Sequence, residues 1–150
     1  MKLFEFQIID NFKKYETQKV NGGTHLRFKS IYCWNLNAAV DEDDHVYFWG
    51  LLFDKKVKKS LCIKVPEIIN DFRVSSVAIG PTMAMLVEKQ SQKSYVIGVN
   101  ANGELGLGDR KQRKTLECLT DLKDKQVSSA AIGKSGFILA LSSVIINPGT

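Results

Sequence analysis

The sequence predicts an all-β protein made of β-propeller blades, each a small sheet of short antiparallel strands. From residue 26 onward, short apolar runs alternate with turn residues. The strand-like segment 75–80 ends in glycine and returns as 128–133, an offset of 53 residues (80 to 133). Segment 48–50 is matched by 96–98 at an offset of 48 residues (50 to 98). A period of about 50 residues with several strands per unit is typical of propellers.

The composition is that of an ordinary globular protein. The chain has 150 residues, of which 44% are hydrophobic and 25% are charged, so it can bury a core and is not disordered as a whole. No apolar run reaches the roughly 20 residues that span a bilayer. Glu5 and Asp10 interrupt the start, which therefore lacks the apolar region of a signal peptide. We expect a soluble, intracellular protein, with cytoplasm and nucleus left open.

The cysteine pattern argues against a metal site and against a disulfide framework. Cys33, Cys62 and Cys118 are odd in number and widely spaced, and no CxxC pair exists. We expect all three to be reduced packing residues, buried or half-buried.

The period divides the chain into a short N-terminal segment and a repeat region. Residues 1–25 are predicted to be an N-terminal strand and linker. Residues 26–150 are predicted to hold two to three repeats, at about 30–73, 74–126 and 127–150, the last incomplete. Such a count makes only part of a propeller.

The individual strands are expected where valine, isoleucine and aromatic residues cluster between turns. The expected strands are 26–28, 30–34, 38–40, 45–49 ending at Gly50, 74–79 ending at Gly80, 83–87, 94–97 ending at Gly98, 127–132 ending at Gly133, and 137–141. Runs such as 77–79 and 138–141 are apolar on consecutive residues, as in a strand covered on both faces. Small residues such as Ala78 and Ala130 allow blades to approach closely.

The acidic run 41–44 lies between two expected strands. A hairpin turn is the favoured interpretation. A metal site is the alternative, although the spaced oxygen ligands and terminal glutamate of a calcium loop are missing.

The densest glycine cluster is the segment 98–109, here called the glycine loop. It holds Gly98, Gly103, Gly106 and Gly108, four of the eleven glycines, directly after an expected strand. Glycine loses the most freedom on folding, so this density indicates a tightly turned backbone. A phosphate-binding loop is the alternative, but the GxxxxGK[ST] ending and the GxGxxG spacing are both absent.

Here the sequence resembles the regulator of chromosome condensation repeat family, over about residues 30–143. The matching residues are Gly98, Asn100, Gly103, Leu105, Gly106, Gly108 and Asp109 in the glycine loop, Trp49 and Gly50 at the loop opening of the earlier unit, and the strand-end glycines Gly80 and Gly133. The resemblance implies a seven-bladed propeller and assigns these residues a structural role in the repeat.

The chain also departs from the pattern of that family. No glycine loop follows Gly50, Trp34 stands where a glycine is expected, and Ile97 replaces the tryptophan that opens the loop. The histidine that follows the strand-end glycine in the family is missing. Two to three blades leave blade faces open, so we expect a fragment of a longer propeller or a ring completed by other chains.

The resemblance implies a non-enzymatic protein-interaction or scaffold module, without catalytic residues, metal or cofactor and without membrane binding. His25 and His45 show no catalytic signature. Guanine nucleotide exchange on a small GTPase is one alternative, and a large cytoskeletal, ciliary or ubiquitin-ligase assembly is a further partner class. Chromatin or DNA binding is another alternative. Its candidate patch is Lys55, Lys56, Lys58 and Lys59, although a basic run this short is more often a solvated loop.

Overall fold

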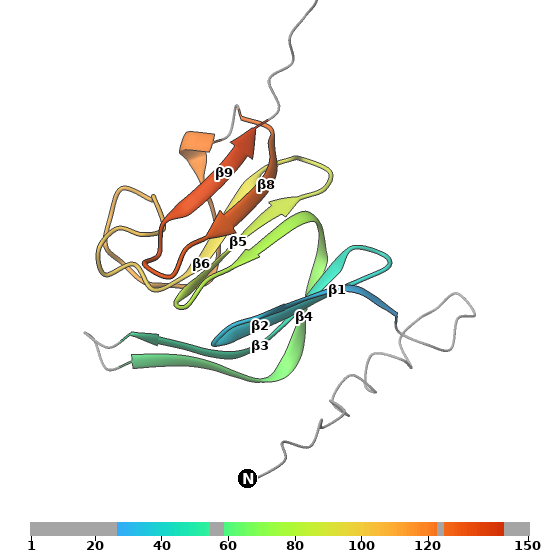
Figure 1. The fold of residues 1–150 in the computed structure, drawn as a ribbon, viewed down its shortest axis with the longest axis horizontal. Coiled ribbons are helices and arrows are strands. Elements are labelled where there is room, and N and C mark those ends of the chain that lie inside the picture. Colours follow the sequence, from blue (N-terminus) through green and yellow to red (C-terminus); the bar gives the residue numbers. More distant parts are fainter. Residues whose placement is uncertain (1–26, 55–58, 123–124, 143–150) are drawn as a thin grey trace, which may run out of the picture.

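The structure is a computed structural model that describes residues 27–54, 59–122 and 125–142 (Figure 1). The expected N-terminal strand and linker, 1–25, lie outside the described residues, and so does His25. Within the described ranges the chain forms nine strands and one short 3-10 helix, which confirms the predicted all-β class.

The first sheet contains β1 (Phe28–Cys33), β2 (Leu36–Asp41), β3 (His45–Asp54) and the first part of β4 (Lys59–Ile79). Each strand pairs antiparallel with the next one in the chain. This sequential order follows from short hairpin connections, which only antiparallel neighbours permit.

The second sheet begins in the middle of β4. Its strands are the end of β4, β5 (Met83–Glu88), β6 (Ser94–Gly98) and β7 (Arg113–Cys118), again antiparallel and in chain order. In β4, Arg73 still pairs with β3, whereas Val74 already pairs with β5. Figure 1 shows β4 winding from one sheet into the next, so these two sheets share one strand.

The third sheet has two strands, β8 (Val127–Ile132) and β9 (Ile138–Ser142), and follows the 3-10 helix at Thr120–Leu122. The three sheets stack face to face (Figure 1). One buried cluster, which includes Val40, Phe48 and Leu86, fills the space between the first and second sheets. A second cluster, which includes Met85 and Val127, lies between the second and third sheets.

The three sheets repeat one local plan. The first strand of each sheet carries a register shift near its start, at Phe28/Ser30, Val74/Ser76 and Val127/Ser129. The turn after this strand is closed by the same hydrogen bond in the second and third sheets. The amide of Gly80 donates to the carbonyl of Met83, and the amide of Gly133 donates to the carbonyl of Phe137, each at 2.9 Å. Phe137 and β9 are therefore the equivalents of Met83 and β5.

The strands differ from the sequence-based expectations in four places. The expected strands 26–28 and 30–34 are a single strand, β1. β3 does not end at Gly50 but continues to Asp54, because Gly50 adopts a φ of 118° and keeps its pairing with Ile63. β4 begins at Lys59 and runs through Pro66 as one long strand, whereas only its last part, 74–79, was expected. β7 was not expected, because its alternating polar side chains are those of an edge strand with little core to cover.

The expectation that 138–141 is covered on both faces is wrong for the described structure. Ile138 and Ala140 are half-buried, but Leu139 and Leu141 are 67% and 59% exposed, and the preceding Phe137 is 80% exposed. Only one face of β9 contacts another described sheet. Cys33 is exposed, so the expectation of a buried or half-buried residue is wrong there, whereas Cys118 is half-buried and the side chain of Cys62 lies outside the described part.

Within the described ranges, no helix has the length and apolar character that crossing a bilayer demands.

Candidate functional site

The glycine loop connects β6 to β7 and is organised by a buried asparagine. Asn100 is fully buried, and its side-chain amide donates to the backbone carbonyl of Asp109 at 2.9 Å and to its carboxylate at 3.1 Å. Its carbonyl oxygen accepts the amide of Leu105 at 2.9 Å. Leu105 is also fully buried and belongs to the core between the second and third sheets. One side chain therefore ties both ends of the loop and its middle to the blade.

Asp109 ends the loop as a charged group. Its carboxylate accepts hydrogen bonds from the Arg113 guanidinium at 2.8 and 3.1 Å and from the Lys111 amide at 2.9 Å. The Arg113 guanidinium, followed by the Lys111 amide, lowers the pKa of Asp109 to about 2, and Asp109 in turn raises the pKa of Arg113. A carboxylate held in this place repels phosphate, so the loop geometry favours a structural turn over a phosphate cradle.

The glycine at the start of the loop is required by a close backbone approach. A Cβ atom on Gly98 would lie 2.4 Å from the carbonyl oxygen of Thr82, and its φ is 135°. Gly50 repeats this arrangement in the first sheet, with a φ of 118° and 2.4 Å to the carbonyl oxygen of Asn35. Trp49 precedes it and is half-buried. The remaining loop glycines Gly103, Gly106 and Gly108 also have positive φ.

The two strand-end glycines differ in what surrounds them. A Cβ atom on Gly80 would lie 2.3 Å from Cγ2 of Ile132 in the neighbouring sheet. A Cβ atom on Gly133 would have no neighbour nearer than the Phe137 carbonyl oxygen, at 3.8 Å. Gly80 therefore lies where two blades contact each other, whereas no neighbouring blade packs against Gly133 in the described structure.

The acidic run forms the hairpin turn between β2 and β3. The buried carboxylate of Asp41 accepts the amides of Asp43 and His45, each at 2.9 Å, and the Tyr47 hydroxyl at 3.1 Å, and it lies 3.2 Å from Nδ1 of His45. Oxygen and nitrogen atoms of Asp41, Asp43 and His45 lie within 4.8 Å of one another, as a metal site needs. The hydrogen bonds of Asp41 are those of a turn, so the geometry favours the hairpin interpretation.

Asp44, in the same turn, links the first two sheets. Its carboxylate pairs with Lys29 on β1 and with Lys89 after β5, and the two ammonium groups lower its pKa, Lys29 first. Its φ is 71°, a conformation that aspartate tolerates. The cluster therefore joins sheets through charge rather than forming an open site.

The candidate basic patch falls mostly on the segment 55–58, outside the described part of the chain. Lys55, Lys56 and Lys58 lie outside the described residues, and Lys59 is the first residue of β4.

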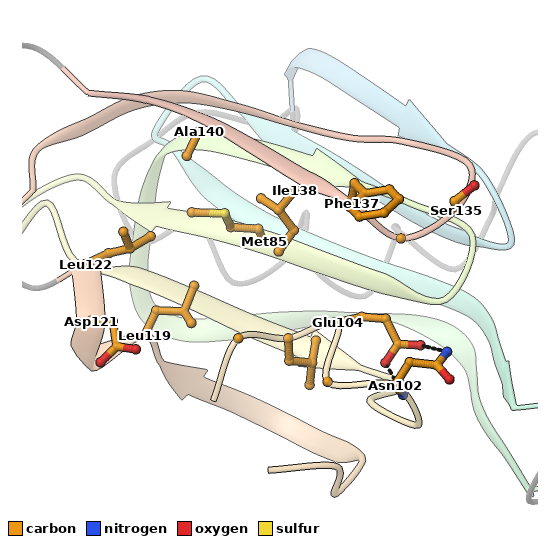
Figure 2. Close-up of a pocket in the computed structure, with 14 residues that line it drawn as sticks. Met85, Asn102, Glu104, Leu119, Asp121, Leu122, Ser135, Phe137, Ile138 and Ala140 are labelled. Carbon is orange, nitrogen blue, oxygen red and sulfur yellow. Dashed lines mark hydrogen bonds between the residues drawn. The ribbon is translucent and has the colours of Figure 1, made fainter. Parts of the chain in front are cut away.

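Sequence reasoning missed a groove between the second and third sheets. It has a volume of about 640 Å³ and is lined by β5, β9, the glycine loop and the segment around the 3-10 helix. In Figure 2, Met85 and Ile138 lie in its interior, Leu119 and Leu122 form one wall, and Glu104 and Ser135 lie at one end. No sequence signal marked it, because the equivalence of Phe137 with Met83 rests on the backbone hydrogen bonds of Gly80 and Gly133.

Comparison with solved structures places the chain among known propellers. The chain matches Prp20p from Saccharomyces cerevisiae with 18% identity and a TM-score of 0.62, over 75% of this chain and 30% of Prp20p. It matches human WBSCR16 with 18% identity and a TM-score of 0.63, over 87% and 38%. In the structure of Kap60 bound to yeast RCC1 (Prp20), the match has 17% identity and a TM-score of 0.63, over 81% and 31%.

The chain thus spans about a third of the length of these solved structures. Searches against protein-family models and against curated protein sequences found no match. At this level of identity the likeness concerns the fold, and it agrees with the strand plan and glycine loop described above. The chain has the fold of RCC1-like β-propeller repeats.

Proposed function

We propose that the chain is a non-enzymatic protein-interaction or scaffold module that works as part of a larger propeller or assembly. One observation carries this proposal. Phe137, Leu139 and Leu141, here called the outer row, are exposed at positions equivalent to Met83, Met85 and Val87. Those three side chains of β5 are fully buried by the third sheet.

The outer row is therefore a surface of the kind that a neighbouring blade covers. Exposed apolar patches of this sort mark interaction sites in soluble proteins, because leaving them in water is unfavourable. The polar side chains support the non-enzymatic part of the proposal. Asp41, Asn100 and Asp109 hold turns and loops through several hydrogen bonds each, rather than pointing into a cavity.

A site-specific photocrosslinker tests the proposal directly. Benzoylphenylalanine replaces Leu139 in the outer row or, as a control, the exposed Glu42 in the β2–β3 turn. We expect discrete protein adducts from position 139 and none from position 42. The double variant Leu139→Asp and Leu141→Asp should lose its partner without losing stability. A monomer that gives no adduct from either position contradicts the proposal.

Guanine nucleotide exchange on a small GTPase is the second candidate, and the likeness to Prp20p favours it. The structure of Prp20p was described together with its binding to Gsp1p and histones. The test is release of a fluorescent guanine nucleotide from a panel of small GTPases that includes Gsp1p. Accelerated release by the chain supports exchange, and unchanged release across the panel removes this candidate. Partnership with a cytoskeletal, ciliary or ubiquitin-ligase assembly stays a prediction.

Chromatin or DNA binding through Lys55, Lys56, Lys58 and Lys59 remains a prediction. Its test is a salt-dependent mobility shift with duplex DNA, in which binding should weaken steeply as salt rises. Binding that survives alanine at all four lysines contradicts the patch. A soluble, intracellular location is part of the same proposal and is tested by fractionation.

A further inference from the structure

We propose that the free edge of β9 and the groove beneath it accept an extended strand from another polypeptide. This strand would carry apolar side chains at alternate positions and a basic residue before its first apolar position. The inference rests on the proposed interaction function and adds the surface and the chemistry of the partner.

The first step is the strand count. The first and second sheets each have four strands, whereas within the described residues the third has β8 and β9 alone. In the second sheet, β5 pairs with β4 on one side and with β6 on the other. Among the described residues, β9, the equivalent of β5, pairs with β8 only.

The second step is the direction of the free backbone groups. The Phe137 carbonyl accepts the Gly133 amide, so in β9 the odd-numbered residues turn their backbone groups toward β8. Ile138 and Ala140 therefore turn their amide and carbonyl groups toward the free edge. Their equivalents in β5, Ala84 and Leu86, are the residues that pair with Ile97 and Tyr95 of β6.

The third step is the space beside that edge. Ile97 of β6 belongs to the core between the first and second sheets, and the ring of Tyr95 stands edge-on to that of Phe72 at 5.0 Å. The corresponding space between the second and third sheets is the groove of about 640 Å³. Ile138 and Ala140 line it, so a strand paired with them would direct alternate side chains into the groove.

The lining defines what such side chains should be. The floor and one wall are apolar and consist of Met85, Leu105, Leu119 and Leu122. Acidic groups lie toward both ends of the groove: Asp121 lies toward the Ala140 end, on the opposite wall, and Glu104 lies toward the Phe137 end (Figure 2). An antiparallel strand would begin at the Ala140 end, where a basic residue would meet Asp121. Main-chain pairing supplies affinity in this mode of recognition, and the alternate side chains supply specificity.

The chain itself provides a probe of this chemistry. Residues 93–99 contain β6 with Lys93 before it, and Tyr95 and Ile97 face the core. The experiment measures fluorescence anisotropy of a labelled synthetic peptide of residues 93–99 titrated with the full chain. We expect saturable binding, and we expect its loss when the peptide carries Tyr95→Ser and Ile97→Ser.

Two protein variants separate edge pairing from simple apolar contact. Ala140→Pro removes an edge amide that does not pair with β8, and proline is tolerated at a strand edge. It should weaken peptide binding about tenfold or more, because a hydrogen bond is lost and the ring obstructs the edge. Leu139→Asp changes the opposite face and should leave binding unchanged. Melting temperatures check that both variants fold.

Absence of saturable binding by the wild-type chain overturns the proposal. Loss of binding in Leu139→Asp with retention in Ala140→Pro also overturns it, because the peptide then docks on the outer row. A chain that forms a dimer sensitive to Ala140→Pro assigns the groove to a second copy instead. If crosslinking from position 139 succeeds while the peptide fails, the groove assignment falls and the proposed function stands.

Discussion

Asn100 shows how one buried polar side chain can specify a whole loop. It makes three hydrogen bonds inside the protein. Because its side chain is fully buried, water cannot take the place of these bonds. Burying a polar group without a partner costs free energy. Removing the Asn100 side chain would add this cost, because it leaves the Leu105 amide without its acceptor. This explains why the loop tolerates many glycines: its conformation is held from inside.

We expect Asn100→Ala to lower the free energy of unfolding by about 2 to 3 kcal/mol, because it deletes these bonds and leaves a buried amide unpaired. Urea denaturation measures the loss. Asn102→Ala is the matched control in the same loop, since Asn102 is exposed and its side-chain amide donates to the carboxylate of Glu104. Its effect should stay near 0.5 kcal/mol, roughly the range of surface substitutions. Equal losses in both variants contradict the role of Asn100.

Asp109 predicts a specific pH dependence. Its pKa in the folded protein is about 2, below the ordinary value of 3.8, because Arg113 stabilises the charged form. A group with a lowered pKa stabilises the fold above its unfolded pKa, and this stability is lost as the pH falls through the folded pKa. The stability difference between wild type and Asp109→Asn should therefore be constant near neutral pH. It should shrink between pH 3.8 and about 2.

Denaturation curves at a series of pH values measure that difference. Arg113→Met should abolish the same pH-dependent part, because the guanidinium is its main cause. A difference that does not change with pH in the acidic range contradicts this account.

At the scale of elements, the blades are held together by contacts that single glycines make possible. Gly80 and Gly133 end equivalent strands, but only Gly80 lies against a neighbouring sheet, through Ile132. Neither has a positive φ, so the comparison isolates space from backbone strain.

We expect Gly80→Ala to destabilise the protein by about 1 to 3 kcal/mol, because the new methyl group would overlap Ile132 and force the sheets apart. Gly133→Ala has room for its methyl group and should change stability by less than about 0.5 kcal/mol. Thermal unfolding measures both. Adding Ile132→Ala should relieve the cost of Gly80→Ala, and strictly additive losses contradict a contact between the two residues.

The sequence predicted the strands whose side chains are apolar and whose ends are marked by glycine. β5, β6 and β8 fall near the expected ranges for that reason. β7 was missed because an edge strand buries few side chains and so carries little apolar pattern. The groove was missed because it depends on a second strand partner that β9 lacks within the described part of the chain, and composition does not report which edge of a strand is open. The glycine loop was found because its backbone demands glycine whatever the context.

At the scale of the whole molecule, the three sheets are not equally supported. The first two sheets share β4, so a change in the structure of one sheet also affects the other. The third sheet has two described strands and one described neighbour, and two-stranded sheets are marginal without further packing. Local opening should follow this difference, since stability varies across a repeat array with the number of covered interfaces.

Hydrogen exchange followed by mass spectrometry tests this ranking. Amides of β8 and β9 should exchange faster than those of β5 and β6, because fewer buried contacts hold the third sheet closed. Leu86→Ala serves as the control, since a cavity between the first two sheets should accelerate exchange in both of them together. Binding of the 93–99 peptide should slow exchange at Ile138 and Ala140, whose amides face the free edge. Uniform exchange across the three sheets would mean that they open as one unit, in which case the free edge of β9 would be no weaker than the rest.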